Sequence, residues 1–158
     1  MKFEQYQKLR DLALKNCLEE GQAYPEPAGL NPIVLAYIGD VVFSGYVRLR
    51  LLPNSGQVRV LHDLAARMVS AVCQAGAMHS MVAELTEEET GVYHRGRNAK
   101  SVVPKSASVQ EYREATAFEA LVGYLYLEQR QERCEELMEK AFKFIVKHYK
   151  EGKKCKSS

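Results

Sequence analysis

The stretch NPIVLAYIGDVVFSGYV, residues 31–47, decides the fold. It opens with Asn31 followed by Pro32, the pattern of a helix N-cap and a proline in the first turn. The rest is apolar on nearly every side, which is typical of a helix enclosed by other helices. Its one charged residue is Asp40, and no Lys or Arg lies within a helical turn. Because an ionised carboxylate is costly to bury alone, Asp40 needs a partner elsewhere in the fold.

A second segment, ATAFEALVGYLYL at residues 115–127, has the same character, and its one acid is Glu119. Two like charges on two central helices are unfavourable together unless a cation bridges them. Small residues surround both acids and leave room for a hydrated ion: Ala36, Gly39, Ser44, Ala115, Thr116 and Gly123. Mg²⁺ takes oxygen ligands, keeps several waters and often uses one or two carboxylates. We therefore predict that Asp40 and Glu119 hold Mg²⁺; the alternative is that each is a hydrogen-bonded structural group.

Other metal chemistry is disfavoured. Di-iron bundles use Glu-x-x-His motifs, and neither acid has a His three residues on. The HExxH motif of zinc proteases is also absent.

The remaining patterns predict a single all-α bundle. Capping boxes at Thr86/Glu89 and Ser108/Glu111 mark two helix starts. Amphipathic periodicity and the turn residues between segments give helices at 2–19, 31–52, 58–83, 86–97, 108–128 and 131–150. We see no convincing strand, internal repeat or interdomain linker. The prediction is one domain over residues 1–150 and a basic, disordered tail at 151–158.

The composition indicates a cytoplasmic protein without a membrane partner. The chain has 158 residues and a net charge of +2, so any nucleic-acid binding must come from local clustering. Its four cysteines have no CxxC pairing, which favours reduced thiols. The charged N-terminus lacks the apolar core of a signal peptide. The longest apolar run is judged too short to span a membrane and contains an acid.

The window GVYHRGRNAKSVVPK, residues 91–105, is basic and contains no acid. Its cationic and polar residues are Arg95, Arg97, Asn98, Lys100, Ser101 and Lys105. Arg pairs well with phosphate oxygens, and Asn or Ser can add hydrogen bonds to phosphate or sugar. Beside a metal site the window predicts a groove for a polyphosphate backbone, and these residues are the candidate contacts to that backbone. The alternative is a solvated run of charge.

These motifs resemble a known family. LAYIGDVVFSGYVRLRLL resembles the signature helix of the ribonuclease III endonuclease domain, and TAFEALVGYLYL resembles its second catalytic motif. LHDLAARMVSA and RGRNAKS are similar to the compact bacterial subgroup called Mini-ribonuclease III. The resemblance covers residues 25–150. It implies an all-helical homodimer that hydrolyses double-stranded RNA with Mg²⁺, leaves 5′-phosphate and 3′-hydroxyl ends, and matures the 23S ribosomal RNA precursor.

The resemblance also implies roles for single residues. The signature aspartate falls on Asp40, the essential glutamate on Glu119, and the aromatic residue that plugs into the partner subunit on Tyr37. Larger members have three further acids, at positions that hold Ile33, Ala36 and Thr116 here. A one-metal core can survive on the two remaining acids, and a tightly held second metal is in doubt.

Two other functions stay open at this point. The missing acids favour a non-catalytic double-stranded-RNA-binding or ribosome-assembly protein of the same fold. A helical adaptor with incidental polar core residues would have no RNA affinity.

Overall fold

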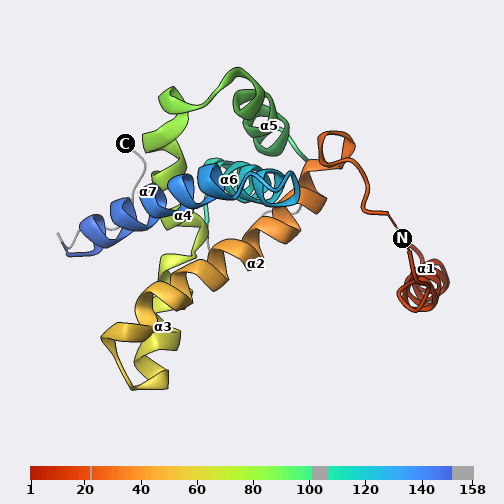
Figure 1. The fold of residues 1–158 in the computed structure, drawn as a ribbon, viewed down its shortest axis with the longest axis horizontal. Coiled ribbons are helices and arrows are strands. Elements are labelled where there is room, and N and C mark those ends of the chain that lie inside the picture. Colours follow the sequence, from red (N-terminus) through yellow and green to blue (C-terminus); the bar gives the residue numbers. More distant parts are fainter. Residues whose placement is uncertain (22, 101–106, 151–158) are drawn as a thin grey trace.

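A computed structural model describes residues 1–21, 23–100 and 107–150, and every regular element in that part of the chain is helical. This confirms the all-α prediction (Figure 1). The α-helices are α1 Phe3–Asn16, α2 Pro32–Leu51, α3 Val58–Met68, α4 Ala71–Met81, α5 Glu87–Arg97, α6 Val109–Leu127 and α7 Gln131–Lys150. Short 3₁₀ turns lie at Pro27–Gly29, Leu52–Asn54 and Val82–Glu84. The predicted tail, 151–158, lies outside the described residues.

Local sequence signals set most of the helix starts. The Asn31 side chain accepts a hydrogen bond from the Ile33 N–H at 2.9 Å, and both predicted capping boxes form. The single helix predicted over 58–83 is wrong. Ser70 interrupts it, and its hydroxyl caps α4 by accepting from the Cys73 N–H at 3.5 Å. Serine favours such caps over helix interiors because its hydroxyl competes for backbone groups.

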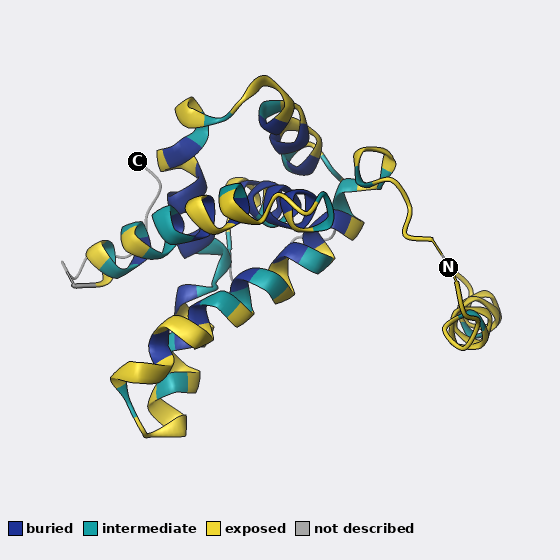
Figure 2. Ribbon diagram, in the orientation of Figure 1, coloured by how far each residue is buried: buried dark blue, intermediate teal, exposed yellow. Residues whose placement is uncertain are grey.

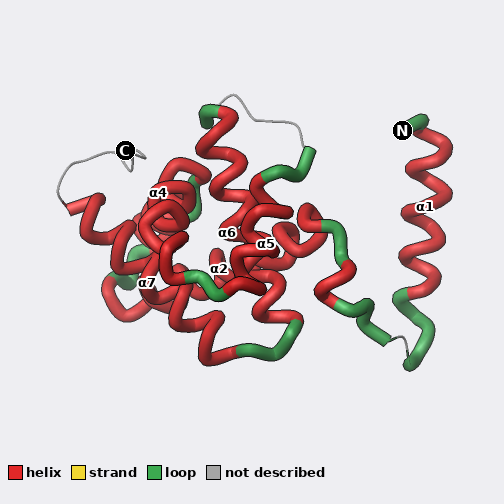
Figure 3. Tube along the Cα trace, turned by 90° about the horizontal axis from the view of Figure 1, so that it is seen from above, coloured by secondary structure: helices red, strands yellow, loops and turns green. Residues whose placement is uncertain are grey.

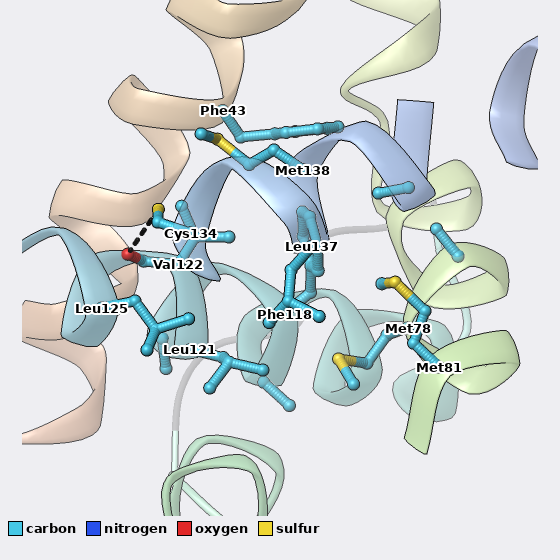
Figure 4. Close-up of a cluster of buried hydrophobic side chains, with 14 of the residues drawn as sticks. Phe43, Met78, Met81, Phe118, Leu121, Val122, Leu125, Cys134, Leu137 and Met138 are labelled. Atoms are coloured by element: carbon cyan, nitrogen blue, oxygen red, sulfur yellow. Dashed lines mark hydrogen bonds between the residues drawn. The ribbon is translucent and has the colours of Figure 1, made fainter. Parts of the chain in front are cut away.

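Helix α6 is the centre of the bundle, packed by α2, α4, α5 and α7 (Figures 1 and 2). Of the twelve positions from Glu114 to Leu125, eleven are buried, and the exception, Glu119, is partly buried. Phe118 meets the ring of Phe43 from α2 edge-on, with centroids 4.9 Å apart (Figure 4). Such aromatic pairs add to the burial energy of the core. The core therefore fixes α2 against α6.

Helix α2 is buried on one side only, so the prediction that it is enclosed is wrong for the single chain. Leu35, Phe43 and Val47 are fully buried, whereas Tyr37 is 72% and Val41 65% exposed. The neighbouring helices cover the face toward α6 and leave the other apolar face bare.

The segment Pro32–Asn54 is long and apolar enough to cross a membrane by those two measures alone, which corrects our judgement that the run is too short. The core helix of a soluble bundle passes the same test, and one face of α2 packs on α6.

Helix α1 stands apart from the other helices in both ribbon and tube views (Figures 1 and 3). None of its residues is buried. It forms where the amphipathic pattern of residues 2–19 predicts it, but it contributes nothing to the core of a single chain.

Candidate metal and catalytic site

The site is built on the crossing of α2 and α6, where two glycines let the backbones touch. A Cβ added to Gly39 would lie 1.8 Å from the carbonyl oxygen of Glu119. A Cβ added to Gly123 would lie 2.0 Å from the carbonyl oxygen of Leu35. Glycine is required at both positions because only its lack of a Cβ permits this approach. The prediction that these two glycines leave space for an ion is therefore wrong, since the facing backbone fills that space.

The same crossing brings the two acids into electrostatic contact. Asp40 follows Gly39 directly, and Glu119 provides the carbonyl that Gly39 touches. Burial and, as the smaller cause, the charge of Asp40 together raise the pKa of the Glu119 carboxyl to about 7. A hydrogen bond from the Gln74 side chain acts in the opposite direction by favouring the ionised form. The prediction that the two central helices touch is confirmed.

Asp40 itself is exposed, which corrects the expectation that it is buried. It lies at the edge of the contact between α2 and α6, where water can solvate the carboxylate. This solvation explains why Asp40 needs no Lys or Arg nearby. An ion at this edge can be reached from solvent.

The donor set fits Mg²⁺. Asp40 and Glu119 lie close enough for the charge of Asp40 to raise the pKa of Glu119, and a cation between them would relieve this repulsion. Across the described residues no group of three or more His, Cys, Asp or Glu could hold a metal. A caged ion such as structural zinc does not fit such a site, whereas Mg²⁺ retains water and phosphate ligands.

The positions of the missing family acids offer no extra ligand. Ala36 and Thr116 are buried, and the Thr116 hydroxyl donates to the Tyr112 carbonyl at 2.9 Å. The residues in place therefore support one metal more directly than two.

Gln74 is the residue at this site that sequence reasoning missed. It is fully buried in α4 and hydrogen-bonded to Glu119. The available signal was an amide inside the apolar run AVCQAGAM. Reading 58–83 as one helix hid the fact that α4 is a separate helix packed on α6.

The basic window is only partly free to bind an anion. The Arg97 guanidinium donates to the buried Glu114 carboxylate at 2.6 Å, and the Tyr93 hydroxyl donates to the same carboxylate at 2.9 Å. Arg95 donates to the Ala28 carbonyl at 2.7 Å and remains exposed. The window contains no acid of its own, but α6 supplies one, which neutralises much of the charge of Arg97.

The other predicted RNA contacts divide into two groups. Asn98 and Lys100 are exposed just beyond the end of α5. Ser101 and Lys105 lie outside the described residues. The backbone of Gly96 packs against Ala117 and Ala120, so the basic end of α5 lies within one helical turn of Glu119 along α6.

Comparison with known proteins agrees with this geometry. Residues 33–130 match the ribonuclease III domain family. The chain is 49% identical over 122 residues to Mini-ribonuclease 3 of Symbiobacterium thermophilum, an alignment that covers 75% of this chain and 93% of that protein. It is 50% identical over 114 residues to Mini-ribonuclease 3 of Enterococcus faecalis, covering 69% and 86%. The chain belongs to the Mini-ribonuclease 3 family. A solved structure, protein FN1578 from Fusobacterium nucleatum, superposes with a TM-score of 0.66 at 28% identity, covering 69% of this chain and 90% of that one.

Membership of the Mini-ribonuclease 3 family makes this protein an endoribonuclease of the ribonuclease III type. The family assignment therefore disfavours both the non-catalytic RNA-binding protein and the helical adaptor. The family assignment also agrees with the all-α fold. Enzymes of the ribonuclease III family generally depend on divalent metal ions.

Proposed function

We propose that this enzyme hydrolyses double-stranded RNA with Mg²⁺ held by Asp40 and Glu119. The products would carry 5′-phosphate and 3′-hydroxyl ends, and the substrate in the cell would be a stem of the 23S ribosomal RNA precursor. The observation that carries the proposal is the α2–α6 crossing. It places one carboxylate from each helix close enough for the charge of Asp40 to raise the pKa of Glu119.

The two carboxylates have different surroundings and therefore different tasks. Exposed Asp40 faces solvent and is accessible to the RNA backbone. Partly buried Glu119 is oriented by the helix contact and by Gln74. When bound between them, Mg²⁺ would supply an activated water and neutralise charge that builds on the scissile phosphate.

RNA affinity would come from exposed cations at the end of α5. Lys100 and Arg95 are exposed, and phosphate contacts dominate affinity for nucleic-acid backbones. The predicted contact by Arg97 would contribute less because its charge faces Glu114. Ser101 and Lys105 remain predicted contacts.

The enzyme would act as a homodimer with Tyr37 near the two-fold axis. Three side chains of one α2 face, Val34, Tyr37 and Val41, are exposed, which is an unusual apolar surface for a monomer. Beside this face a groove of about 1170 Å³ runs between α2, the end of α6 and α7. A two-fold interface uses the same patch on both subunits, so an apolar stripe beside an apolar groove can be self-complementary.

Two experiments test these proposals. Purified protein is incubated with a perfect RNA duplex in Mg²⁺ or EDTA, and product ends are mapped. Cleavage only in Mg²⁺ with 5′-phosphate ends is expected, and metal-independent cleavage would contradict the site. For the dimer, light scattering on Tyr37→Asp should give monomers with sharply reduced cleavage. A wild-type monomer at micromolar concentration would defeat the dimer.

A further inference from the structure

The side chain of Gln74 is a fully buried amide that donates hydrogen bonds through Nε2 but accepts none through Oε1 among the described residues. Its Nε2 donates to the Val69 carbonyl at the end of α3, at 3.0 Å. The side chain also hydrogen-bonds the Glu119 carboxylate. Its Oε1 is buried and has no hydrogen-bond partner among the described residues. Nε2 therefore donates to the Val69 carbonyl and acts on the Glu119 carboxylate, whereas the buried acceptor is left unpaired.

The neighbours fix this orientation of the amide. A carbonyl and an ionised carboxylate accept hydrogen bonds and cannot donate them. Turning the amide over would place Oε1 against two acceptors, so Nε2 must face both. An apolar side chain of the same length would fill the interior without leaving a buried acceptor unpaired. The amide is thus poorly suited to packing alone and well suited to holding a carboxylate.

We propose that Gln74 is a positioning residue that holds the Glu119 carboxylate in the orientation needed to bind the metal. The Val69 carbonyl anchors one N–H of the amide, which directs the other toward Glu119. One carboxylate oxygen would then accept from Gln74 and leave the other for the ion. This inference rests on the proposed function, since it concerns the same metal site. It adds a contribution from α4 to a site otherwise formed by α2 and α6.

Hydrogen bonds of this kind tune metal sites in general, and their loss typically costs about 10- to 100-fold in metal affinity or activity. The test variant is Gln74→Met, which keeps an unbranched side chain of similar length and removes both donors. Met78→Ala is the matched control, because Met78 is fully buried four residues further along α4 and points into the apolar core (Figure 4). It perturbs the packing of the same helix without removing a hydrogen bond to Glu119.

The measurement is calorimetric titration of the full-length protein with Mn²⁺ alone, followed by cleavage of duplex RNA over a range of Mg²⁺ concentrations. Gln74→Met should weaken Mn²⁺ binding and raise the half-saturating Mg²⁺ concentration by about 10-fold or more. Met78→Ala should lower the melting temperature and leave both metal values unchanged. Wild-type Mn²⁺ affinity in Gln74→Met, or an equal loss in Met78→Ala, would overturn the role of Gln74. A wild-type protein that binds no Mn²⁺ would instead overturn the metal site itself.

A second measurement needs no folded variant. In the ¹⁵N-labelled wild-type protein, the Nε2 protons of Gln74 should shift on addition of Mg²⁺ at concentrations that support cleavage. Resonances that do not respond to Mg²⁺ would also overturn the proposal.

Discussion

Replacing Glu119 with Gln should stabilise the metal-free protein at neutral and alkaline pH. The pKa of Glu119 is raised from 4.5 to about 7, mainly by burial and then by Asp40. Between these two values the folded state binds more protons than the unfolded state, so stability falls as pH rises and the loss is complete above pH 7. A pKa raised this far corresponds to about 3 kcal/mol. Gln cannot ionise, and so the variant escapes this loss.

The assay is thermal unfolding of wild type and Glu119→Gln in EDTA from pH 4 to 8. For a chain of this length, about 3 kcal/mol corresponds to a rise of roughly 5–10 °C in melting temperature at pH 8. The difference should shrink toward zero near pH 4, where both side chains are uncharged. Adding Mg²⁺ should stabilise wild type and not the variant, because a ligand stabilises only the state that binds it. A variant that melts below wild type at pH 8, or a difference that does not change with pH, would refute this reasoning.

Three further predictions follow from the contacts. Gly39→Ala should lower stability by about 3 kcal/mol or more, because its Cβ would lie 1.8 Å from a carbonyl oxygen of α6. Gly45→Ala is the control, since a Cβ there meets nothing within 4 Å, and equal melting of the two variants would contradict the close crossing. Arg97→Ala should lower the melting temperature and have little effect on the salt dependence of RNA binding. Lys100→Ala should leave stability intact and reduce the slope of log affinity against log salt concentration by roughly one unit or less. A larger change of this slope in Arg97→Ala would place Arg97 on the RNA. Deleting residues 1–20 should change the melting temperature by no more than about 1–2 °C, because α1 buries no residue, and a drop of several degrees would show that α1 packs on the folded protein.

Helix starts were predictable from the sequence because their signals are local. Asn31, Thr86 and Ser108 each cap a helix through a backbone N–H two or three residues away. The same chemistry at Ser70 was hidden because the apolar periodicity continues across it, and the two helices α3 and α4 were read as one. Caps are visible in a sequence when the pattern also changes, and Ser70 lacks that change.

The pairing of Asp40 with Glu119 was predictable because two isolated acids on two apolar helices raise a shared electrostatic problem. The surroundings of the two acids could not be predicted from the sequence. The exposure of Asp40 depends on which face of α2 the other helices cover. The ion pair of Glu114 with Arg97 and the hydrogen bond from Gln74 join residues far apart in sequence, and neither leaves a periodic signal.

The central claim, that Asp40 and Glu119 together hold the catalytic metal, is tested most directly by Asp40→Asn and Glu119→Gln on one RNA duplex. Each substitution removes a charge and keeps the shape of the side chain, while the cations at the end of α5 remain. Cleavage in Mg²⁺ and duplex affinity in Ca²⁺ are measured on both variants. The expected result is loss of cleavage with duplex affinity equal to wild type or slightly higher. Cleavage within a few-fold of wild type in either variant would contradict the claim.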